Sequence, residues 1–191
     1  RTTVQQKLEE TLLEVETRIE ERTRDLENSN RNLESLWNIS NMLDADFTNI
    51  CEKILHEITT ISGSPYGFYG FLNDSEEVMT IYSWSNEAMK DCAIHSNPIE
   101  FPIADSGIWG NAVRERKPFL LNNYADSCEN KKGTPPRHVQ LTRVLSVPVL
   151  LSGKVVAVGT VANKSTDYTE NDIQQLKSYL TSAHIILDLK R

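Results

Sequence analysis

This chain has few cysteines, no long apolar run and no excess of basic charge, and each of these features argues against one class of protein. Three cysteines among 191 residues argue against a disulfide framework and favour a reducing, cytoplasmic setting. No apolar run approaches the roughly 18 residues of a membrane-spanning helix, so we expect no membrane contact by this segment. The net charge of −7 at pH 7 disfavours nucleic acid as a partner, because phosphates attract basic patches.

Glycine and proline are absent from the first 43 residues, where Trp37 is the only aromatic. Apolar residues recur there at alternating steps of four and three, as in a heptad seam, at Leu8, Leu12, Val15, Ile19, Leu26, Leu33, Leu36 and Leu43. Arg22, Ser29 and Ser40 occupy the remaining seam positions, where polar residues set register at a cost in stability. We therefore predict a dimerising coiled-coil helix over 1–35, followed by a second domain over 36–191, rather than one amphipathic helix lying on that domain. Because the chain begins at Arg1 rather than Met, we expect it to be a segment of a longer protein.

After residue 43 the pattern becomes that of a mixed domain. Asp44-Ala45-Asp46 offers an N-cap for a helix that ends at Gly63-Ser64-Pro65, and Thr169 opens the last helix. A shorter helix is expected over 106–116, capped by Ser106. Strands are expected between these helices, at 66–73, 78–85, 99–103, 118–122, 144–151 and 154–162. This order predicts an α+β domain with a central antiparallel sheet flanked by terminal helices.

The stretch from Cys92 to His138 contains the residues best suited to hold haem or a metal. Cys92 and His138 lie 46 residues apart, so only a folded pocket could bring their side chains together. His138 belongs to an 18-residue loop, 123–140, which is long enough to be functional.

Several short strings follow one another in order along the second domain. They are Ser83-Trp84-Ser85, Gly107-Ile108-Trp109-Gly110, Asn122-Asn123-Tyr124, the run from Arg143 to Val149, and Ala162-Asn163-Lys164. Their order over roughly 36–187 resembles the GAF subfamily of bacterial and archaeal sensor histidine kinases, and 20–26 resembles the helical linker that precedes such domains. The resemblance implies the GAF fold and a sensory role.

A closer resemblance is to the haem-carrying GAF domains of methanogenic archaeal sensor kinases that respond to methyl sulfides. It implies a haem whose iron has His138 as axial ligand and whose vinyl group is joined to Cys92 by one thioether, with His95 as the second candidate ligand. No Cys-x-x-Cys-His string is present, which excludes attachment of the c-type cytochrome kind. The expected apolar walls are Ile81, Trp84, Ile108, Trp109, Tyr124 and Leu145.

The same resemblance implies how the domain works. A redox or gas-ligand change at the haem is expected to pass through a homodimer, formed by the N-terminal and C-terminal helices, to a kinase domain and response regulator outside the segment. No catalytic residue is expected within the segment itself.

Other interpretations remain open. A GAF thiol reductase acting on free methionine sulfoxide would need Cys92 and Cys128 to meet, and an unliganded dimerisation module would need no cofactor. Cyclic nucleotide is disfavoured because Tyr168 and Ile173 depart from the signature of the GAF domains that bind it. In this chain we expect Lys164 and Asp172 instead to tie the last strand to the last helix.

Overall fold

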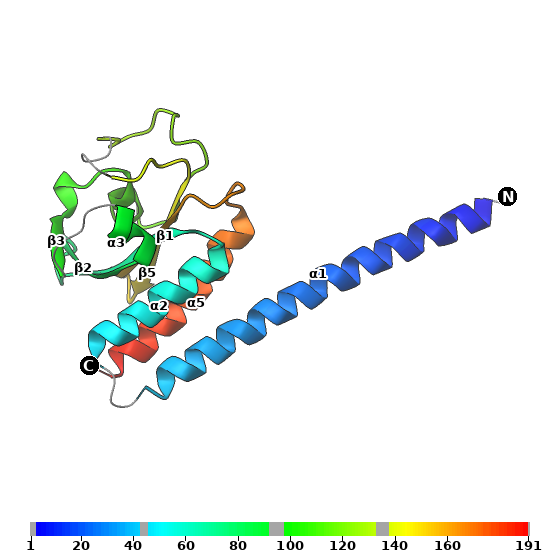
Figure 1. Cartoon of the computed structure of the whole chain (residues 1–191), viewed down its shortest axis with the longest axis horizontal. Helices are drawn as coiled ribbons and strands as arrows, with labels where there is room; N and C mark the ends of the chain where they lie inside the picture. The colour runs from blue at the N-terminus through cyan, green and yellow to red at the C-terminus, as the bar shows by residue number, and fades with distance from the viewer. Residues whose placement is uncertain (1–2, 43–45, 92–97, 133–137, 191) are drawn as a thin grey trace.

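A long helix and a rounded body make up the molecule (Figure 1). The computed structural model describes residues 3–42, 46–91, 98–132 and 138–190. Helix α1 (Thr3–Ser40) projects away from the body. The body contains, in order, α2 (Phe47–Ser62), β1 (Tyr66–Leu72), β2 (Val78–Trp84), α3 (Asn86–Asp91), β3 (Ile99–Pro102), the 3₁₀ turns η1 (Ile103–Asp105) and η2 (Ile108–Gly110), α4 (Asn111–Arg114), β4 (Phe119–Leu121), β5 (Val144–Leu151), β6 (Lys154–Ala162) and α5 (Glu170–Asp188).

The strands form one antiparallel sheet in the order β3-β2-β1-β6-β5-β4. Central strand β1 is buried on both faces, whereas β2 alternates between buried and half-buried residues. Side chains of a strand point alternately to the two faces of its sheet, so this difference means that both faces are covered at the centre. The α+β class with a central antiparallel sheet is confirmed.

Helices α2 and α5 lie side by side on one face of the sheet (Figure 1). Asp46 caps α2 by accepting a hydrogen bond from the Asn49 amide at 2.8 Å, and Gly63 ends it in the left-handed region at φ +61°. Thr169 caps α5 in a reciprocal capping box with Asp172. Both predicted helix starts are therefore confirmed, at Asp46 within the predicted cap and at Thr169.

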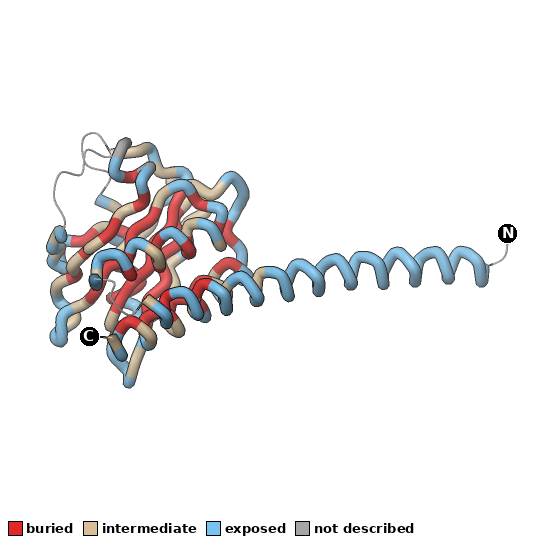
Figure 2. The backbone as a smooth tube through the Cα atoms, turned by 60° about the horizontal axis from the view of Figure 1, so that its bottom comes forward, coloured by how far each residue is buried: buried red, intermediate tan, exposed pale blue. Residues whose placement is uncertain are grey.

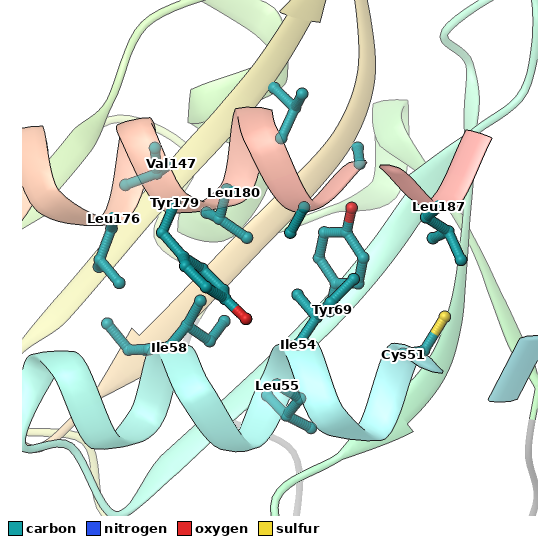
Figure 3. Close-up of a cluster of buried hydrophobic side chains, with 14 of the residues drawn as sticks. Cys51, Ile54, Leu55, Ile58, Tyr69, Val147, Leu176, Tyr179, Leu180 and Leu187 are labelled. Carbon is teal, nitrogen blue, oxygen red and sulfur yellow. The ribbon is translucent and has the colours of Figure 1, made fainter. Parts of the chain in front are cut away.

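Beneath these helices lies the main hydrophobic core (Figure 3). Ile58 and Leu180 are fully buried there, and burial of such a side chain contributes about 1.5–3 kcal/mol. Two tyrosines keep their hydroxyl groups satisfied within this core. The Tyr69 hydroxyl lies 2.7 Å from His184 Nδ1, and the Tyr179 hydroxyl lies 2.8 Å from Ser35 Oγ on α1.

Helix α1 contacts the body only near its C-terminal end. Ser35 and Ile39 are buried there, while the earlier part of the helix lies in solvent (Figure 2). As far as Leu33 its apolar seam is accordingly exposed, from 50% at Val15 to 62% at Leu8, Leu26 and Leu33. No helix in the described residues has the length and hydropathy to cross a membrane. An exposed apolar stripe of this length needs a partner, and the described chain supplies none before Ser35.

One predicted helix is wrong. Residues 106–116 do not form a single helix capped by Ser106, because the chain there makes the turn η2 and then the short helix α4. The Ser106 hydroxyl points back instead and donates to the Ile103 carbonyl at 2.7 Å, while accepting from Arg114 at 2.8 Å. A Cβ at Gly110 would lie 1.7 Å from that hydroxyl oxygen, so the turn depends on glycine.

Candidate functional site

A cavity of about 480 Å³ lies on the sheet face opposite α2 and α5. The sheet forms its floor, and segment 101–109 and the described parts of the loop, 123–132 and 138–140, contribute to its walls. The lining residues are Tyr66, Gly67, Phe68, Ile81, Trp84, Ala88, Phe101, Pro102, Asp105, Ser106, Gly107, Ile108, Trp109, Tyr124, Lys132, His138, Val139, Leu141, Val144, Thr160, Val161 and Ala162. The volume falls within the roughly 300–1,000 Å³ of typical small-molecule sites.

Most of the residues predicted to surround a ligand come together in this cavity. They are Ile81, Trp84, Ile108, Trp109, Tyr124 and His138. Cys92 and His95 lie outside the described residues; Cys92 is the residue after α3, whose Ala88 lines the cavity.

Leu145 was expected in the wall, and this expectation is wrong. Its fully buried side chain belongs to the core beneath α2 and α5, on the other face of the sheet. The preceding residue, Val144, lines the cavity instead. A shift of one residue along a strand moves a side chain to the opposite face, so the hydrophobic run from Val144 to Val149 did not reveal which residues face the cavity.

His138 has the hydrogen bonding of a metal-binding imidazole. Its ring is half-buried, and Nδ1 lies 2.7 Å from the Val139 carbonyl oxygen. A carbonyl oxygen only accepts, so Nδ1 carries a proton, and the tautomer that matches this bond has its lone pair on Nε2. Such a bond on the second ring nitrogen orients histidines that bind metals.

The interior wall is aromatic. Phe68 lies 5.3 Å from Trp84 and 6.0 Å from Trp109 between ring centroids, and Phe101 lies 5.7 Å from Trp109. The Trp84 indole N–H is buried and meets no acceptor within the described part of the chain. Phe68 and Phe101 stand in predicted strands but were not among the residues expected to surround a ligand. Together the rings suit a flat, largely apolar ligand.

Arg114 is not among the lining residues of the cavity, but it holds the turn that forms one of its walls. Its guanidinium donates to the carbonyls of Ile103 and Gly107 and to Asn111 Oδ1, at 2.6–2.9 Å, and so holds the turn from 103 to 111. Partial burial lowers the pKa of this guanidinium from its ordinary value.

The loop 123–140 is tied to that turn. Asn111 Nδ2 donates to the Glu129 carbonyl at 3.1 Å, Asn130 Nδ2 donates to Asn111 Oδ1 at 2.9 Å, and Lys132 Nζ donates to the Asp105 carbonyl at 3.0 Å. Burial, followed by the nearby Cys128 thiol, raises the pKa of the Tyr124 phenol, which therefore stays neutral at the cavity edge. The hydrogen bonds of Glu129, Asn130 and Lys132 hold residues 129–132 against the turn from 103 to 111.

The described cysteines lie outside the cavity lining. Cys51 is fully buried in the core on the other face of the sheet, and Cys128 is half-buried in a cluster beside the cavity. No group of three or more His, Cys, Asp or Glu side chains capable of holding a metal occurs within the described ranges. A haem iron needs fewer protein ligands than that.

Asp172 and Lys164 form the tie expected between the last strand and α5. Lys164 Nζ lies 2.8 Å from each oxygen of Asp172, and neither residue lines the cavity. A structural role therefore accounts for both residues.

The sequence matches a protein family and a sensor protein. Residues 44–188 match the model of the GAF domain family. The "methyl sulfide methyltransferase-associated sensor" of Methanosarcina acetivorans is 37% identical over 144 residues, which cover 75% of this chain and 14% of that protein. This chain therefore spans a small part of that relative.

Solved structures share the fold. The GAF domain of a phosphoenolpyruvate-protein phosphotransferase from Acinetobacter has a TM-score of 0.63 at 14% identity, covering 84% of this chain and 94% of that one. The free methionine-R-sulfoxide reductase from Neisseria meningitidis has a TM-score of 0.56 at 11% identity, covering 83% and 87%. At these identities the likeness concerns the fold alone.

Proposed function

Because this chain belongs to the GAF domain family, we propose that its cavity is a sensory haem site with His138 as the iron ligand. The bond from His138 Nδ1 to the Val139 carbonyl carries this proposal, since it leaves Nε2 of a cavity-lining ring free to bind iron. The relative from M. acetivorans is named as a sensor, which supports a sensory role here.

The other cavity residues fit a porphyrin. The rings of Phe68, Trp84, Phe101 and Trp109 offer apolar surface to a flat macrocycle, and the burial they provide favours it over water. We propose that Cys92 attaches the haem by a single thioether, because α3 brings the chain to the cavity wall at Ala88, four residues earlier.

Haem supplies an iron centre whose oxidation state and external ligand respond to redox conditions and dissolved gases. The chain's own residues orient His138 through the Val139 carbonyl and exclude water through the aromatic wall. Polarity around the site then sets which small molecules gain access.

We propose that the response leaves the domain through its helices. The Ser35–Tyr179 bond joins α1 to α5, and α5 packs against the sheet whose other face lines the cavity. A second copy of the chain would cover the exposed seam of α1, forming a parallel dimer in which Arg22 and Ser29 weaken the seam locally. The receiving kinase domain and its response regulator would lie outside this segment.

Haem titration tests the site. Reconstituted wild-type protein is expected to show a Soret band, and His138→Ala is expected to shift it because the iron loses its axial ligand. His56→Ala is the matched control, since His56 is exposed on α2 and does not line this cavity. Absence of a Soret band in the wild type contradicts the haem proposal, and an unchanged spectrum in His138→Ala reassigns the ligand to His95 or another residue.

Acid-acetone extraction tests the thioether separately. Haem is expected to stay with the wild-type protein and to be extracted from Cys92→Ala, with Cys128→Ala behaving as wild type. Extraction from the wild type would show that the haem is held without a covalent bond.

A further inference from the structure

The haem-binding cavity proposed above has one basic side chain among its described lining residues, although the chain as a whole has a net charge of −7. That residue is Lys132, and the single acidic residue of the described lining is Asp105. His138 is left out of this count because it is the proposed iron ligand, with its Nδ1 proton donated to the Val139 carbonyl. Lys132 is exposed, so its ammonium marks a place where the cavity meets solvent.

One hydrogen bond holds the Lys132 ammonium at the cavity and leaves its other donors available. Its Nζ donates to the Asp105 carbonyl at 3.0 Å, and a lysine ammonium has three donors, so two of them remain for a ligand. Lys132 is absent from the described salt bridges, so its charge is not neutralised by a carboxylate there.

The neighbouring lysine is placed differently. Lys131 Nζ donates to the carbonyls of Tyr124 and Asp126 and lies 4.5 Å from the centre of the Tyr124 ring. It does not line the cavity. Two lysines adjacent in the sequence therefore have different roles: Lys131 braces the loop, and Lys132 presents charge to the cavity.

We propose that Lys132 binds a carboxylate of the ligand, so that the cavity selects a molecule with an apolar, flat body and an acidic edge. This inference rests on the haem site proposed above, and for haem the carboxylate is a propionate. The aromatic wall of Phe68, Trp84 and Trp109 accepts the body, while the edge remains at the solvent side beside Lys132. Lys132 is thus a specificity-determining residue, independent of the iron.

Titration with haem and with haem dimethyl ester tests this inference, because esterification removes both negative charges and keeps the macrocycle. Wild-type protein is expected to bind haem about fivefold more tightly than the ester, near the upper end for an exposed ion pair. Added salt is expected to shrink this preference through screening. Lys132→Met keeps most of the aliphatic stem and is expected to lose the preference, whereas Lys131→Met is expected to retain it.

The outcomes separate the two proposals. If the wild type binds both compounds equally, or if Lys131→Met loses the preference as fully as Lys132→Met, the role of Lys132 is overturned while the haem site stands. If neither compound binds, the haem site itself is overturned. Binding of iron-free protoporphyrin with the same preference for the free acid would support Lys132 independently of His138.

Discussion

Replacing Asp172 by asparagine tests how much a largely buried ion pair contributes to the last helix. The Asp172 side chain is 10% exposed and accepts four hydrogen bonds, two from Lys164 Nζ at 2.8 Å and one each from the amide and hydroxyl of Thr169 at 2.7 and 2.9 Å. Burial by itself would raise the pKa of this carboxyl. The bonds from Lys164 and Thr169, with the Lys164 charge, outweigh burial and hold the pKa below its ordinary value.

Asparagine keeps the shape but places an NH₂ group against these donors and leaves the Lys164 ammonium without its counter-charge. Hydrogen bonds to charged groups contribute about 1.5–3 kcal/mol each, and Asn Oδ1 still accepts part of the set. We therefore expect Asp172→Asn to lower the free energy of unfolding by about 2 kcal/mol, measured by urea denaturation at pH 7. Glu170→Gln is the matched control, because Glu170 is an exposed acid in the same helical turn, and its loss should cost about 0.5 kcal/mol.

Acid is expected to remove the difference in unfolding free energy between the wild type and Asp172→Asn. Since the folded-state pKa of Asp172 is depressed, its contribution is present above the unfolded-state pKa of about 4 and is lost as the pH falls through the lower, folded-state value. The gap between wild type and Asp172→Asn should therefore narrow below about pH 4. Equal losses for Asp172→Asn and Glu170→Gln at pH 7, or a gap that does not narrow in acid, would refute the reasoning.

Two further predictions concern packing and assembly. Gly159→Ala should cost about 1–3 kcal/mol in urea denaturation, because its Cβ would lie 2.6 Å from Leu180 Cδ1; Gly107→Ala is the control, since its Cβ would meet only the Asn130 carbonyl oxygen at 3.7 Å. Ile19→Asp should convert the proposed α1 dimer to monomers in analytical ultracentrifugation, because it buries a charge in the seam. Thr17→Asp, an exposed position outside the seam, should leave the association unchanged, and equal dissociation of both variants would argue against the seam.

Local sequence patterns predicted most of the helices and strands of the domain. The strands predicted at 144–151 and 154–162 form the hairpin of β5 and β6, and Thr169 indicated the start of α5, because hairpins and caps depend on residues close together in the chain. The segment 106–116 was mispredicted as one helix. Its turns follow Arg114, whose donors reach carbonyls up to 11 residues away, and no helical period records such a contact.

By itself, the sequence determined the fold class, the caps of α2 and α5, the apolar seam of α1 and six of the residues that line the cavity, since these follow from periodicity, capping chemistry and the order of short motifs. Only the tertiary structure decided that Val144 rather than Leu145 lines the cavity, that Phe68 and Phe101 join the wall, and which of two adjacent lysines lines the cavity. A two-residue period distinguishes two faces of a strand but does not say which face the helices cover. That choice depends on contacts between segments distant in the chain. For the stretch from Cys92 to His138, the tertiary structure places His138, with its oriented ring, at a cavity.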